Sequence, residues 1–104
     1  MKHTLKTDIY SFQAIYDGRK KHEIRFNDRD YRTGDDLALK ETKHTGEEMK
    51  AGEPLIFTGA SILAKVTHVL HGPIQGLMDG WVIMSIEVLY KHKPPARHHE
   101  EEGG

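Results

Sequence analysis

A change of hydrophobic period at Gly18 is the feature that most constrains the fold of this chain. Apolar residues before it recur at spacings of three and four, at Ile9, Phe12, Ile15 and Tyr16. This spacing predicts a helix with one apolar face, and Gly18 is suited to end it because glycine tolerates the left-handed conformation. From Lys21 to Asn27 the period becomes two, which indicates a β-strand.

The predicted strand carries charge on one face only. Lys21, Glu23, Arg25 and Asn27 are expected on that face, and His22, Ile24 and Phe26 on the other. We expect the apolar face to pack on the body of the protein. The charged face has two interpretations: an edge strand whose charges prevent aggregation, or a cleft in which Glu23 and Arg25 pair and fix each other's rotamers.

The remaining segments complete an α+β, predominantly β pattern. Strands are predicted at residues 2–6, 37–41 and 81–90, with residues 55–57 and 61–70 forming two short strands or one long bent strand. Thr7 or Asp8 is suited to cap the helix, and residues 42–53 are expected to form a mobile polar loop. This order predicts a small, mostly antiparallel β-barrel with one N-terminal helix packed on it.

Length and composition limit what the chain can be. Its 104 residues fit one domain, expected at residues 1–90, followed by a disordered charged tail at 91–104. The absence of cysteine excludes disulfides and thiolate chemistry. No apolar run approaches the ~18 residues that span a bilayer, and the N-terminus lacks a signal-peptide pattern. We therefore expect a monomeric cytoplasmic protein that does not bind membranes.

Positive charge is concentrated locally rather than globally. The formal net charge is −1, but residues 18–32 hold six basic and three acidic residues. Such a local excess suits a polyanion or a nucleotide as partner.

The histidines and glycines do not predict a metal or phosphate site. His68 and His71 are three residues apart, which places them on opposite faces of a strand, and His98 and His99 lie in the tail. The glycines at 72, 76 and 80 lack the Gly-Lys-Ser/Thr ending of a phosphate loop. We expect no metal and no cofactor.

Several motifs resemble a known superfamily. The segment GRKKHEIR fits the G-x-K-x-x-E-x-R signature of the ASCH superfamily, whose domains are PUA-like barrels. The segments FNDRDYRTGDDLALKE and GLMDGWVIMSIEVL resemble more specifically the DUF3850 family, which is common in phages and bacteria. This resemblance covers about Lys2 to Leu89.

The resemblance implies a cleft lined by the signature residues, here Lys20, Glu23 and Arg25. Many relatives are thought to bind RNA or modified nucleotides. One branch hydrolyses acylated cytidine with a threonine nucleophile assisted by the signature lysine, and another is described as a ribonuclease. Glu23 occupies the position of that threonine in this chain, so the same covalent mechanism is not expected here.

Three functional hypotheses follow. In the first, the chain is an RNA- or nucleotide-binding module in which Lys20 and Arg25 bind an anionic group and Glu23 orients Arg25. Arg29 and Tyr31 are further ligand-binding candidates, by stacking or hydrogen bonding, although Tyr31 has the alternative of packing on the barrel. In the second, Lys20 and Glu23 are the catalytic acid/base pair of a small nucleoside or RNA hydrolase that uses water as nucleophile. In the third, the chain is a phage-type interaction module that binds a host protein.

Overall fold

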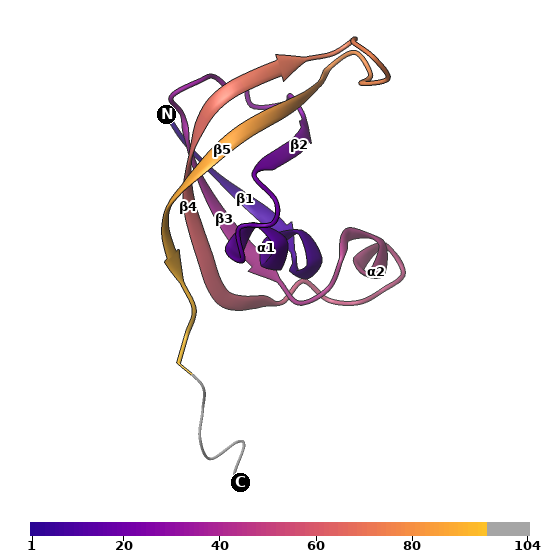
Figure 1. The fold of residues 1–104 in the computed structure, drawn as a ribbon. Coiled ribbons are helices and arrows are strands. Elements are labelled where there is room, and N and C mark those ends of the chain that lie inside the picture. The colour runs from indigo at the N-terminus through magenta and orange to yellow at the C-terminus, as the bar shows by residue number, and fades with distance from the viewer. Residues whose placement is uncertain (96–104) are drawn as a thin grey trace, which may run out of the picture.

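A strand and a helix open the chain in the computed structural model, which describes residues 1–95 (Figure 1). Strand β1 spans Lys2–Asp8 and helix α1 spans Ile9–Tyr16. The Asp8 side chain caps α1 by accepting a hydrogen bond from the backbone N–H of Ser11 at 3.0 Å. The strand predicted at residues 2–6 is thus confirmed as β1, and because it precedes α1 the helix is not strictly N-terminal.

Four further strands join β1 in a single sheet. They are β2 (His22–Phe26), β3 (Asp36–Thr42), β4 (Phe57–His71) and β5 (Trp81–His92). The strand order is β1-β3-β4-β5-β2, and the sheet curls into a half-barrel (Figure 1). The predominantly β, α+β class is confirmed. Closure is not complete, because β1 and β2 remain as the two edges of the sheet.

The pairing of β1 with β3 is parallel, whereas the other three pairings are antiparallel. A parallel pair requires a crossover connection, and α1 with β2 lies in that connection. The expected mostly antiparallel sheet therefore contains one parallel edge.

The core occupies the concave side of the sheet. Alternate residues of the strands point inward there, and α1 adds two side chains from its apolar face. The buried apolar residues are Leu5, Phe12, Ile15, Tyr31, Leu37, Leu39, Ala60, Ile62, Ala64, Val66, Val82, Met84 and Ile86.

The orientation of β2 is the reverse of the predicted one. Glu23 lies opposite Met84 in the β2–β5 register, so its side chain is on the core face and is only 3 % exposed. Ile24 and Phe26 point outward, with 48 % and 53 % of their surface exposed. Alternation identifies two faces, but the curl of the sheet decides which face is enclosed.

The polar segment 42–53 is more regular than expected. Thr42 belongs to β3 and is buried, and a short helix, α2, spans Gly46–Lys50. Thr45 and Glu48 form a capping box at its start, in which each side chain accepts a hydrogen bond from the other residue's backbone N–H. The expectation of a loop throughout residues 42–53 was therefore wrong at Thr42 and at Gly46–Lys50.

The C-terminal half of the chain is built on one long hairpin. Residues 57–71 form a single strand, β4, with Gly59 at a φ of +94° near its start. Of the two predicted alternatives, two short strands or one long bent strand, the long bent strand is confirmed. Strand β5 continues to His92, and the tail residues 96–104 lie outside the described part of the chain. No helix within residues 1–95 has the length and apolar character needed to cross a bilayer.

Candidate functional site

A cleft of about 650 Å³ lies at the opening of the half-barrel, between the edges formed by β1 and β2. Its walls come from β1, α1, β2, the segment after β2, and α2. The residues that line it are Leu5, Lys6, Thr7, Asp8, Ser11, Lys20, Glu23, Ile24, Arg25, Phe26, Asp28, Arg29, Tyr31, Thr42, Gly46, Met49 and Trp81.

Glu23 is the central charged group of the cleft. Its carboxylate oxygen Oε2 accepts a hydrogen bond from Arg25 Nε at 2.9 Å, and Oε1 lies 3.8 Å from the ammonium of Lys20. The side chains of Lys20 and Arg25 are 22 % and 27 % exposed, whereas that of Glu23 is 4 % exposed and lies deeper in the cleft wall. A buried carboxylate that contacts two cations fixes the position of both.

Lys20 also connects β2 to α1. The backbone N–H groups of Arg19 and Lys20 both donate to the carbonyl of Ala14, which folds this segment back against the helix. From there the Lys20 ammonium donates a hydrogen bond to the Ser11 hydroxyl oxygen. Since Ser11 accepts this bond, its own proton is available for donation to a ligand.

Two arginines reach across the opening to the far edge of the sheet. Arg25 Nη2 donates to the backbone carbonyl of Lys6 at 2.8 Å and lies 3.4 Å from the Thr7 hydroxyl. Arg29 Nη1 donates to the carbonyl of Thr4 at 2.9 Å. Thr4 and Lys6 are two residues apart on β1, so their carbonyls point to the same side of the strand. The two guanidinium groups therefore bind alternate carbonyls along that edge.

Tyr31 forms part of the cleft wall from within the core. It is 2 % exposed, its ring packs edge-to-face on His3 at a centroid distance of 4.9 Å, and its backbone N–H donates to the Asn27 side chain. Burial raises the pKa of the Tyr31 hydroxyl, and the nearby charges of Arg25 and Arg29 oppose this rise. Because the ring is enclosed, Tyr31 packs on the core, as one of its two predicted roles required, and has no open face on which a base could stack.

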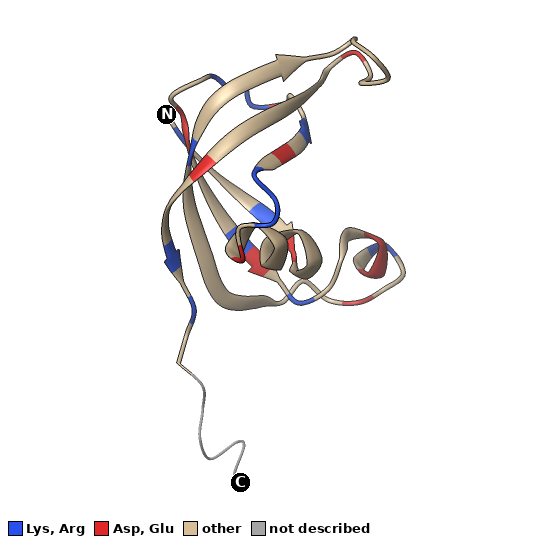
Figure 2. Ribbon diagram, in the orientation of Figure 1, with Lys and Arg blue, Asp and Glu red and all other residues tan. Residues whose placement is uncertain are grey.

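The lining of the cleft has a slight excess of positive charge. Lys6, Lys20, Arg25 and Arg29 are opposed by three acidic side chains, those of Asp8, Glu23 and Asp28. Figure 2 shows basic residues on β2 and on the segment leading into it, with an acidic residue between them, and a basic residue on β1. Glu23 is paired with Lys20 and Arg25, and Asp8 caps α1, so this arrangement suits an anionic ligand that carries additional hydrogen-bonding groups.

Comparison with known families identifies one that covers this cleft. The family described as domain of unknown function (DUF3850) matches residues 2–86. The chain belongs to the DUF3850 family. No curated protein shows significant similarity to it.

The DUF3850 match contains every residue of the cleft, and sequence reasoning anticipated only some of them. Lys20, Glu23, Arg25, Arg29 and Tyr31 all line it, and so do residues that were not singled out, among them Lys6, Ser11 and Met49. The capping-box spacing of Thr45 and Glu48 was a signal for α2, which carries Met49 to the cleft. Ser11 had no such signal, because its role depends on how the chain folds back at Gly18.

Metal-binding geometry is not found in the part of this DUF3850 protein that the structure describes. Within residues 1–95 no group of three or more His, Asp or Glu side chains is arranged to hold a metal ion. His98 and His99 lie outside these residues.

Proposed function

We propose that the cleft binds an RNA segment or a nucleotide through Lys20 and Arg25. The observation that carries this proposal is the convergence of Lys20, Glu23 and Arg25 on one opening of about 650 Å³, a size typical of small-ligand sites. These side chains come from the strand β2 and the turn before it, so their shared position is set by the backbone rather than by flexible loops.

Each side chain has a distinct role in this proposal. The guanidinium of Arg25 is a planar donor suited to a phosphate, and the Lys20 ammonium adds a second positive charge. Ser11 supplies a neutral hydroxyl donor. Glu23 holds both cations and is also able to accept a hydrogen bond from the exocyclic amino group of a base.

The residues of the cleft also support a more specific assignment of the fold. We propose that the half-barrel is a PUA-like fold and that the family belongs to the ASCH superfamily. Lys20, Glu23 and Arg25 are the signature positions of that superfamily, and they lie together at the mouth of the curled sheet. A cytoplasmic location is part of the proposal, supported by the absence of cysteine.

Titration followed by NMR tests the binding proposal. A panel of ribonucleoside monophosphates, short RNAs and short DNAs is added at low and high salt, and backbone amide shifts are recorded. We expect salt-sensitive shifts around Lys20 and Arg25 with at least one ligand, and their loss in Arg25→Gln. Arg32→Gln is the matched control, because the Arg32 side chain is exposed and, among residues 1–95, forms its ion pair with Asp30 alone. A panel without any salt-sensitive shift would refute the proposal.

The contact between Lys20, Glu23 and Ser11 favours a second candidate function, hydrolysis of a nucleoside or RNA substrate. Glu23 would accept a proton from an attacking water, and Lys20 would donate a proton to the leaving group. The test measures turnover of acylated nucleosides and RNAs by the wild type, Lys20→Ala and Glu23→Gln. We expect turnover by the wild type and its loss in both variants; no wild-type turnover, or turnover unchanged in both, would exclude this function.

A further inference from the structure

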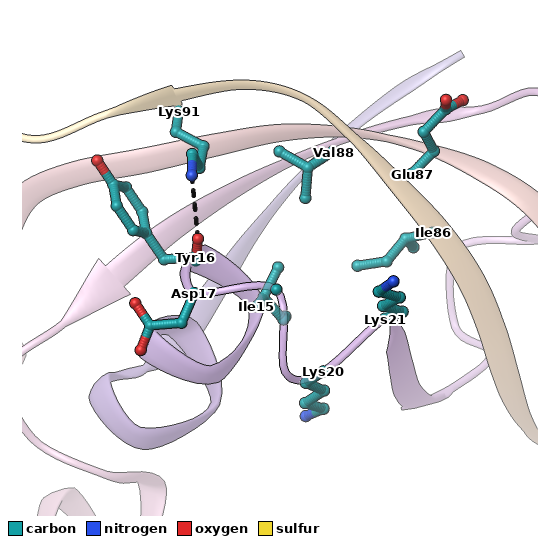
Figure 3. Close-up of a pocket in the computed structure, with 10 residues that line it drawn as sticks. Ile15, Tyr16, Asp17, Lys20, Lys21, Ile86, Glu87, Val88 and Lys91 are labelled. Atoms are coloured by element: carbon teal, nitrogen blue, oxygen red, sulfur yellow. Dashed lines mark hydrogen bonds between the residues drawn. The ribbon is translucent and has the colours of Figure 1, made fainter.

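A second hollow, which we call the groove, adjoins the cleft on the side of β5. It has a volume of about 360 Å³ and lies between the C-terminal end of α1 and β5 (Figure 3). Its apolar wall includes Ile15 of the helix and Ile86 of β5. Lys20 lines both the groove and the cleft, so this one residue borders the two hollows.

Tyr16 holds two lysine ammonium groups at one end of the groove. The Nζ atoms of Lys91 and Lys93 lie 4.6 Å and 4.2 Å from the centre of the Tyr16 ring, within the range of a cation–π interaction. Lys91 also donates to the backbone carbonyl of Tyr16 at 3.2 Å (Figure 3). These contacts keep two positive charges beside the groove.

Lys21 supplies charge between this end and the cleft. It is exposed, and Figure 3 shows it beside Ile86. Two carboxylates also border the groove. That of Asp17 pairs with Arg19 at 3.1 Å, and that of Glu87 points away from Lys21 (Figure 3). Three lysines therefore border the groove: Lys20, Lys21 and Lys91.

We infer that the groove binds the nucleotide next to the one in the cleft, so that the ligand is single-stranded RNA of more than one nucleotide. This inference rests on the proposed RNA- or nucleotide-binding function. Proteins that bind single strands combine a basic groove that follows the phosphates with apolar or aromatic surfaces for the bases. Val88, which is 37 % exposed, provides apolar surface here beside the buried Ile15 and Ile86, and Lys20, Lys21 and Lys91 provide the charges.

The experiment compares uridine monophosphate with tetrauridylate at several salt concentrations, using calorimetry on the full chain. The wild-type protein is expected to bind tetrauridylate more tightly than uridine monophosphate. The dependence of log K on log salt concentration should also be steeper for tetrauridylate. Lys21→Gln should lower that slope by about 0.7 for tetrauridylate, the value for one phosphate contact in a single strand. It should leave binding of the monophosphate unchanged.

Two controls separate the groove from the cleft. Lys40→Gln removes the same charge from an exposed position of β3 that lines neither hollow, and it should leave both ligands unaffected. Arg25→Gln should weaken the binding of both ligands. If Lys21→Gln binds tetrauridylate with the wild-type slope while the monophosphate still binds, the groove inference is wrong and the cleft proposal stands. If the wild type binds neither ligand, the cleft proposal fails and the groove inference fails with it.

Discussion

Arg25 Nη2 donates a hydrogen bond to the backbone carbonyl of Lys6 at 2.8 Å, across the opening between the two edges of the sheet. The Nε atom of the same guanidinium donates to Glu23 at 2.9 Å. One side chain thus links the edge strands β2 and β1 where a closed barrel would have strand pairing. Since this side chain also borders the cleft, ligand binding and stability of the half-barrel are coupled through it.

Arg25→Lys should lower the free energy of unfolding by about 1–3 kcal/mol. A lysine ammonium lacks the fork of a guanidinium, so it cannot keep both the Glu23 and the Lys6 hydrogen bonds, and bonds to charged groups contribute about this amount. Urea denaturation measures the change. Arg32→Lys is the matched control and should stay within about 0.5 kcal/mol, since Arg32 pairs with Asp30 at the surface. Equal effects of the two substitutions would contradict a linking role for Arg25.

Asp8→Ala should cost about 1 kcal/mol of stability and displace Ser11 in the cleft. The Asp8 carboxylate accepts the Ser11 N–H at the start of α1, and alanine cannot replace this cap. Asp8→Ser should retain most of the stability, because serine is also a good capping residue. Thermal unfolding compares the two variants, and amide shifts of Ser11 and Lys20 report on the cleft. An alanine variant as stable as the serine variant would argue against the cap.

The sequence predicted the elements of this fold better than their orientation. Period-two and helical spacings are local, and they identified α1, β2 and the long strand β5. The direction in which Glu23 points depends on its pairing with Met84 and on the curl of the sheet, both of which are set by distant residues. Alternation therefore located the charged face correctly, but the enclosure of Glu23 and the exposure of Phe26 could not be inferred from it.

In the candidate site, too, the sequence identified residues that are close together in the chain but not their distant partners. Lys20, Glu23 and Arg25 lie within six residues, so a motif could identify them together. Their partners are remote along the chain: Lys6 contributes a carbonyl from the opposite edge, and Ser11 contributes a hydroxyl from α1. No local pattern marks a backbone carbonyl as a partner, and only the folded chain brings it near the guanidinium.

Asp35→Asn should reduce the loss of stability in acid. The hydrogen bond from His3 lowers the pKa of Asp35 below its ordinary value of 3.8, with further contributions from the Arg32 N–H and the N-terminal amine. Because the folded state favours the carboxylate, this group stabilises the protein above pH 3.8, and the contribution is lost as the pH falls through the lowered pKa. Asparagine does not titrate, so the free energy of unfolding of this variant should depend less steeply on pH.

Urea unfolding at a series of pH values between roughly 5 and 2 measures this acid dependence. Some dependence should remain in Asp35→Asn, because the hydrogen bond from Lys65 also lowers the pKa of Asp36. Asp30→Asn is the control, since Asp30 forms its ion pair with Arg32 at the surface. A profile for Asp35→Asn that coincides with that of the wild type would show that this carboxylate does not contribute.

Gly72→Ala should destabilise the β4–β5 hairpin by about 1–3 kcal/mol, the usual cost of overpacking. A Cβ atom at Gly72 would lie 2.1 Å from the backbone carbonyl oxygen of Met78 and 2.8 Å from its carbon, so the backbone itself must move. The Gly72 N–H donates to the carbonyl of Trp81 at 2.9 Å, which holds this part of the chain in place.

The matched control for this substitution is Gly46→Ala in the first turn of α2. Its added Cβ meets nothing within 4 Å, and alanine favours a helix over glycine by roughly 0.5–1 kcal/mol, so the control should be neutral or slightly stabilising. Urea denaturation measures both variants, and hydrogen exchange at the amides of β4 and β5 localises the effect. If the midpoint of urea unfolding is the same for Gly72→Ala and the wild type, the close approach between residues 72 and 78 does not constrain the hairpin.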